Sequence, residues 1–128
     1  MKKYSLLLLL TSLLIACNPP VGPDVAGSVE GLYQLVDYRS PTVIDLVPSG
    51  TLNAIKIDNQ HVLITVTGMV GKTKINYKLP SVLVTNIDRT TTSLTVKGKS
   101  VGQIVDNGTS LYVSLTPAPN ITIGAMVF

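Results

Sequence analysis

The stretch "TKINYKL", from Thr73 to Leu79, alternates polar and apolar side chains with a period of two. Its apolar members, Ile75, Tyr77 and Leu79, occupy every second position. A period of two is typical of a β-strand that has one face against a core and the other in water. This stretch therefore predicts a half-buried strand of an antiparallel sheet.

The same alternation recurs from residue 30 onward, and valine, isoleucine and threonine dominate the alternating runs. We expect strands near residues 31–38, 42–47, 51–58, 61–68, 72–79, 82–87, 92–98, 100–105, 110–116 and 120–127, with some of them fused or irregular. Short consecutive strands joined by tight turns predict an all-β domain of about eight or nine strands. The architecture is then a single antiparallel up-and-down barrel or a β-sandwich.

The turns between these runs are marked by polar residues. The segment "DNGT", Asp106 to Thr109, contains Asn-Gly, which predicts a hairpin whose two central residues both have positive φ. Asp58, Asp88 and Asp106 stand in such turns, where aspartate commonly accepts hydrogen bonds from its own backbone.

The N-terminus has a different pattern. Lys2 and Lys3 precede an apolar run that ends at Ala16 and at Cys17, the single cysteine of the chain. A basic start, an apolar core of this length and a small residue before the end are typical of a secretory signal. The run is shorter than the roughly 20 apolar residues of a membrane-spanning helix.

The segment Leu14-Ile15-Ala16-Cys17 resembles the lipobox of bacterial lipoproteins. The resemblance implies cleavage before Cys17 and lipidation of Cys17, which would anchor the protein to a membrane. In that family an aspartate after the cysteine favours the inner membrane. Asn18 therefore favours the outer membrane as the location in the cell envelope. The alternative is an ordinary secretory signal that includes a thiol.

These features divide the chain into three parts. Residues 1–16 form the predicted signal peptide, residues 17–28 a flexible lipid-anchored tether rich in proline and glycine, and residues 29–128 the all-β domain. Removal of the leader lowers the basic residues from 10 to 8 against 7 acidic ones. A nearly neutral domain has no electrostatic footprint for nucleic acid, so we expect no nucleic-acid partner.

The segment "EGLYQLVDY", Glu30 to Tyr38, is similar to the first strand of lipocalin-like domains, in which Gly-x-Trp lets an aromatic ring close the barrel floor. Gly31 and Tyr33 occupy the matching places, with tyrosine in place of tryptophan. The resemblance implies a small β-barrel with Tyr33 at its floor. The alternative is that Gly31 relieves a bend and Tyr33 is an ordinary strand aromatic.

Residues suited to catalysis are few. His61 is the single histidine and stands beside a turn, and the acidic residues show no calcium-loop spacing. We therefore predict no catalytic residues, no metal site and no cofactor. A hydrolase is the last alternative, and it would require two carboxylates, or His61 with a serine and an acid, in one pocket.

Two features suggest a contact surface. Tyr112 lies on the polar face of its strand, and Val82, Leu83 and Val84 run without alternation within "SVLVTNI". The alternative for the second feature is a strand buried on both faces. We predict a non-enzymatic binding or interaction domain, for a small apolar ligand or an envelope protein; the alternative is a structural accessory subunit of an envelope complex. The content of leucine, isoleucine and valine favours a filled barrel over a hollow one.

Overall fold

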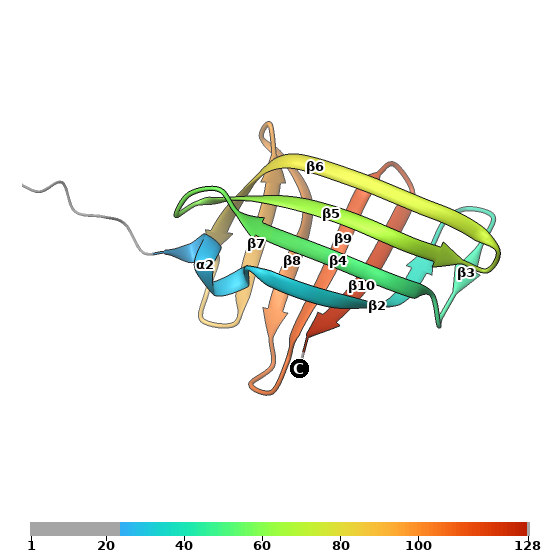
Figure 1. Cartoon of the computed structure of the whole chain (residues 1–128). Coiled ribbons are helices and arrows are strands. Elements are labelled where there is room, and N and C mark those ends of the chain that lie inside the picture. The colour runs from blue at the N-terminus through green and yellow to red at the C-terminus, as the bar shows by residue number, and fades with distance from the viewer. Residues whose placement is uncertain (1–23, 128) are drawn as a thin grey trace, which may run out of the picture.

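The computed structural model describes residues 24–127 of the chain, and it contains nine strands and one short helix (Figure 1). The predicted signal peptide, Cys17 and residues 17–23 of the predicted tether lie outside the described residues. The elements are α2 (Val25–Val29), β2 (Gly31–Arg39), β3 (Ile44–Asp45), β4 (Ser49–Lys56), β5 (His61–Val70), β6 (Thr73–Asn86), β7 (Thr91–Val96), β8 (Lys99–Asp106), β9 (Leu111–Ala118) and β10 (Ile121–Val127).

The strands form a closed antiparallel barrel. Their order is β10-β9-β8-β7-β6-β5-β4-β2-β3, and an additional ladder joins β10 to β2. Apart from the two-residue strand β3, which pairs with the end of β2, each strand lies between its neighbours in the sequence. The structure therefore confirms the up-and-down barrel and excludes the sandwich.

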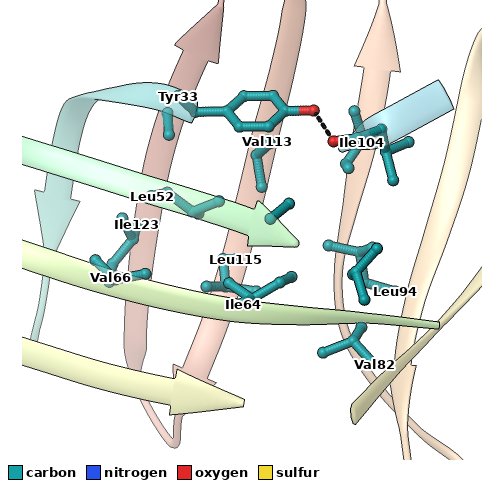
Figure 2. Packing of buried hydrophobic residues seen from close by; sticks show 14 of the residues in the cluster. Tyr33, Leu52, Ile64, Val66, Val82, Leu94, Ile104, Val113, Leu115 and Ile123 are labelled. Carbon is teal, nitrogen blue, oxygen red and sulfur yellow. Dashed lines mark hydrogen bonds between the residues drawn. The ribbon is translucent and has the colours of Figure 1, made fainter. Parts of the chain in front are cut away.

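The barrel interior is occupied by one apolar cluster. Every one of the eight barrel strands contributes side chains to it, and most of these are less than 5% exposed (Figure 2). The largest fully buried members are Tyr33, Leu52, Ile64, Leu94, Leu115, Ile123, Val62, Val66, Val82 and Val113. Branched side chains of this size suffice to fill an eight-stranded barrel. This finding agrees with the predicted filled interior.

A pair of glycines lets two neighbouring strands approach closely. Gly50 on β4 lies opposite Gly68 on β5. A Cβ atom at Gly68 would collide with the carbonyl oxygen of Ser49, and one at Gly50 would collide with the carbonyl oxygen of Thr67. Glycine at both positions therefore permits the curvature that closure of the barrel requires.

The predicted strands 72–79 and 82–87 are one long strand, β6, with a bulge in its middle. Ile64 of β5 pairs with Leu79, whereas Val62 pairs with Val82, so that β6 contains one extra residue between these pairs. The extra residue shifts the alternation of β6 by one position. The inward side chains are odd-numbered up to Leu79 and even-numbered from Val82.

The folded domain begins earlier than the predicted boundary at residue 29. Residues 25–28 were expected to belong to the flexible tether, but they form most of α2, in which Val25, Ala26 and Val29 are buried. Asp24 caps the helix by accepting a hydrogen bond from the Gly27 amide. The apolar residues of this five-residue turn were too few to give a helical period in the sequence.

The helix α2 lies at one end of the barrel, opposite the end that carries β3 (Figure 1). The Ala26 amide donates a hydrogen bond to the carbonyl oxygen of Asn59 at 3.0 Å, and the Lys56 ammonium contacts the Asp24 carboxylate at 2.7 Å. These contacts join α2 to the β4–β5 turn and to the end of β4.

Tyr33 fixes α2 from inside the barrel. Its side chain is fully buried, and its hydroxyl donates a hydrogen bond to the carbonyl oxygen of Val29 at 2.6 Å (Figure 2). Burial raises the pKa of Tyr33 to about 12. The ring thus lies under the helical end of the barrel, and the lipocalin-like interpretation of this position stays a prediction.

Two local predictions were wrong in detail. The expected strand 42–47 contains only the two residues of β3, because Asp45 accepts hydrogen bonds from the amides of Val47 and Gly71 and draws the chain away from β2. The Asn-Gly hairpin exists, but of its two central residues only Gly108 has positive φ. The Asn107 side chain instead accepts from the amides of the following residues and closes a four-residue loop.

We predict that Tyr33→Phe lowers the free energy of unfolding by about 1–3 kcal/mol, because it leaves a buried carbonyl oxygen without its donor. Folding raises the pKa of Tyr33 from 10.0 to about 12. The protonated hydroxyl therefore stabilises the folded state fully below about pH 10, and this stabilisation is lost as the pH rises toward about 12. Urea titrations at pH 8, 10 and 11.5 should show that the difference between wild type and Tyr33→Phe shrinks with pH. A constant difference would contradict this account.

Candidate functional site

An open groove of about 600 Å³ lies on the outer face of the barrel where β6 and β7 separate. Its lining residues come from β5, β6, β7 and the β7–β8 turn, and they are His61, Pro80, Ser81, Leu83, Thr95, Val96, Lys97 and Gly98. The ladder between β6 and β7 ends at the pair Leu83–Thr95, which forms part of the groove wall. The groove is therefore a fork between two strands, and we call it the fork groove.

The fork exists because β7 is much shorter than β6. The chain turns back at Lys97 and Gly98, which both have positive φ, 51° and 81°. Two such residues form the type of tight turn that suits a two-residue hairpin. β7 therefore ends at Val96, while β6 extends from the fork to Thr73 near β3 (Figure 1).

Exposed apolar side chains surround the fork groove on the outer face. Leu83 is 37% exposed, and Ile55 and Ile57 near the end of β4 are 42% and 53% exposed. Cross-strand pairs connect them. Ile55 lies opposite Leu63 on β5, and Leu83 lies opposite His61, which is on the same face of β5 as Leu63. The outer face thus presents apolar surface on three adjacent strands, which suits contact with another macromolecule.

His61 lies at the edge of the groove with its ring fixed by an acid. Its Nδ1 atom is 2.9 Å from Asp58 Oδ1, and the same carboxylate oxygen accepts from the Gln60 amide. The Gln60 amide and then the His61 ring hold the pKa of Asp58 below its usual range. The pair therefore closes the β4–β5 turn.

Ser81 lines the same groove as His61, so a histidine, an acid and a serine do come near one another. Within residues 24–127, however, no hydrogen bond joins Ser81 to His61, and the Asp58 carboxylate already serves the turn. A nucleophilic serine requires a hydrogen bond to its base. The described part of the chain also contains no group of three residues that could hold a metal ion.

The aspartates of the turns behave as the sequence predicted. Asp58, Asp88 and Asp106 each accept a hydrogen bond from the amide two residues later, at 2.8 Å in all three cases. The backbone amide of Thr90 is the main cause of the lowered pKa of Asp88. All three carboxylates organise turns. Asp88 and Asp106 also line one pocket of about 260 Å³ beside α2, together with Arg89, whereas Asp58 is not among its lining residues. Both carboxylates in that pocket are held by the backbone amides of their own turns.

The predicted contact segment is divided between the two faces of β6. Val82 and Val84 are 0% and 2% exposed and point into the core, so they form no outer contact surface. Leu83 points outward into the fork groove. Residues 82–84 are therefore neither an exposed apolar segment nor a strand buried on both faces. The bulge after Leu79 shifts the alternation by one residue, and beyond it inward and outward side chains alternate again.

Tyr112, the other predicted contact residue, lies across the seam that closes the barrel. Its hydroxyl reaches over Gly124 on β10 and lies 3.5 Å from Asp37 Oδ2 on β2. Burial, and then the Asp37 carboxylate, raise the pKa of Tyr112. An aromatic ring that covers a glycine on a neighbouring strand is a known device for stabilising sheets. The structure thus gives Tyr112 a structural contact across three strands.

Sequence reasoning missed most of the fork groove. It identified Leu83, but not Pro80, Thr95, Val96 or Lys97. A signal was available, because proline inside a strand is confined to free edges and bulges, and Pro80 separates two alternating runs. The sequence did not reveal that β7 ends opposite this point.

Comparisons of the chain with protein-family models, with curated proteins and with solved structures found no match. Within residues 24–127 no helix has the length and apolar character needed to cross a membrane. The chemistry of the fork groove is determined by the side chains that line it.

We predict that Tyr112→Ala destabilises the barrel by about 1–2 kcal/mol, because it uncovers Gly124 and the seam between β10 and β2. Tyr112→Phe should cost less than about 0.5 kcal/mol, since the hydrogen bond to Asp37 is at the limit of length. Gly124→Ala should cost about 1 kcal/mol, because its methyl group displaces Tyr112 and Asp37. Thermal unfolding of the variants checks this order, and an unchanged Tyr112→Ala would contradict it.

Proposed function

We propose that this protein is a lipid-anchored protein of the bacterial cell envelope whose barrel binds another envelope protein through the fork groove. The barrel acts in this proposal as a binding module without catalysis. Its role as an accessory subunit of a larger complex is the nearest alternative, and it would use the same surface.

The observation that carries the proposal is the occupied interior. The inner faces of all eight barrel strands meet in one cluster of buried apolar side chains. A barrel that carries a small molecule in its interior needs a cavity there to enclose the ligand. Binding is therefore assigned to the outer face, where the fork groove and the exposed side chains of Ile55, Ile57 and Leu83 lie.

The chemistry of the groove supports binding over catalysis. Its walls combine the apolar side chains of Pro80, Leu83 and Val96 with the single positive charge of Lys97. An apolar centre with a polar rim is the usual composition of a protein interface. His61, the one side chain suited to general-base chemistry, is fixed in its turn by Asp58.

The anchor rests on the sequence of the leader. Leu14 to Cys17 matches the lipobox pattern, and the folded domain begins at α2 shortly after Cys17. A protein with two or three acyl chains stays on a membrane essentially permanently, because a single chain alone binds only marginally. The α2 end of the barrel would then be the end nearer to the membrane.

We predict that a photo-crosslinking amino acid in place of Leu83 yields one defined adduct in native cells, because this side chain lies in the fork groove. Leu32 is the matched control, since it is also an exposed leucine on the outer face but belongs to β2. Immunoblots of irradiated cells would detect the adducts. The same adduct from both positions, or no adduct from position 83, would contradict the assignment of the fork groove as the binding site.

We predict that labelling with an alkyne fatty acid modifies the wild-type protein and leaves Cys17→Ala unlabelled. The wild type should partition into the detergent phase of Triton X-114 and the variant into the aqueous phase, because the acyl chains dominate membrane affinity. Ser28→Ala, a change at another small residue, should label like the wild type. Equal labelling of all three proteins, or of none, would refute the lipid anchor.

A further inference from the structure

The strand β6 has a free edge that begins at the fork groove. Its ladder with β7 covers only Leu83 to Asn86, whereas its ladder with β5 extends down to Thr73. Along residues 73–82 the side of β6 that faces away from β5 therefore has no strand beside it in the described part of the chain. Figure 1 shows this length of β6 continuing beyond β7 toward the end of the barrel that carries β3.

The geometry of the β5–β6 hairpin shows which backbone groups lie on this edge. Val70 pairs with Thr73 across a two-residue turn, and the pair that closes such a turn exchanges hydrogen bonds. Ile75, Tyr77 and Leu79 follow at intervals of two and bond to β5 in the same way. The N–H and C=O groups of Lys74, Asn76 and Lys78 therefore point to the free edge.

The inner face of this length of strand is incompletely covered. Ile75, Tyr77 and Leu79 are only partly buried, in contrast to the inward residues Val82 and Val84 beyond the bulge. A strand added at the edge would place alternate side chains beside these three residues. Apolar side chains at those positions would extend the core.

The outer face of the same length carries positive charge. Lys74 and Lys78 are exposed and lie on either side of Asn76, and Lys97 stands in the groove at the end of the edge. Opposite charges on directly opposed residues stabilise a strand pair, and like charges destabilise it. An added strand should therefore carry acidic residues on its outer face.

A second copy of this chain fits the edge poorly. Two β6 edges that pair antiparallel about Asn76 would place Lys74 of one copy opposite Lys78 of the other. An anionic lipid headgroup would neutralise the charges of the lysines, but it has no row of hydrogen-bond donors and acceptors to pair with the free backbone groups. The edge therefore favours an extended polypeptide of another protein.

We propose that the free edge of β6 receives an extended segment of a partner protein, added as a strand between β6 and the β7–β8 hairpin. The segment has acidic residues at its outward positions and apolar residues at its inward ones, and one of its ends lies in the fork groove. This inference rests on the proposed function, for which it specifies the chemistry of the partner. Addition of a strand at a sheet edge is an established mode of peptide recognition.

The test uses the full-length protein in a neutral detergent and three nine-residue peptide probes. In the first probe glutamate alternates with valine, in the second lysine alternates with valine, and the third is the first with alternate backbone nitrogens methylated. Amide hydrogen exchange, measured by NMR, should slow at least tenfold at Lys74, Asn76 and Lys78 when the acidic probe saturates the protein. Exchange at Ile75 and Tyr77 should stay unchanged, because their amides already bond to β5.

Charge reversal on the protein supplies the matched control. Lys78→Glu should weaken binding of the acidic probe at least tenfold and favour the lysine probe. Arg89→Glu removes the same charge from an exposed turn at the other end of β6, and it should bind like the wild type. The methylated probe should bind at least tenfold more weakly than its parent.

Several outcomes would overturn the inference. Equal affinity for the acidic and basic probes would do so, and so would exchange at the edge amides that the acidic probe does not slow. Protection of the edge amides that rises with protein concentration in the absence of a probe would indicate a second copy of this chain. Binding of anionic vesicles that leaves the edge amides exchanging freely would indicate a lipid headgroup. If Leu83 still forms its defined adduct in cells, these outcomes refute strand addition alone. If that adduct is also missing, the proposed function fails as well.

Discussion

The ladder between β10 and β2 is the constraint on which the rest of the structure depends. It joins the last strand of the sheet to the first and so divides every strand into an inner and an outer face. Tyr112 lies over this seam and reaches from β9 across Gly124 to Asp37. Side chains on the inner face then pack against one another and against α2, and they fill the barrel.

Because the barrel is filled, a binding site has to be sought on the outer surface of its wall. Register shifts occur in several ladders of this wall, and at β6 one extra residue coincides with a short partner strand. The bulge turns Leu83 outward, and the early end of β7 leaves the space that becomes the fork groove. The groove and the free edge therefore have a common origin in the mismatch between a long strand and a short one.

The sequence predicted the parts of this fold that depend on local pattern. Alternation identified the strands because side chains report their face directly, and the turn aspartates were predicted because their bonds span two residues. The bulge of β6 depends on how two strands align, and the groove depends on where β7 ends. Such registers are set by pairing between distant residues, so Val82 and Val84 were assigned to the wrong surface. The helix α2 was missed because it is held by hydrogen bonds with Tyr33 and Asn59, which lie outside it.

The attachment of α2 to the barrel also determines how a mechanical load would enter the domain. A pull on the chain before Asp24 would pass through α2 into β2, whose first half (residues 31–34) pairs with β4 and whose second half (residues 34–39) pairs with β10. The force would run parallel to both ladders and shear them, so that many hydrogen bonds would have to break together. Peeling a strand from an edge breaks them one at a time and needs less force. A domain loaded in this direction would resist extension until both ladders yield together.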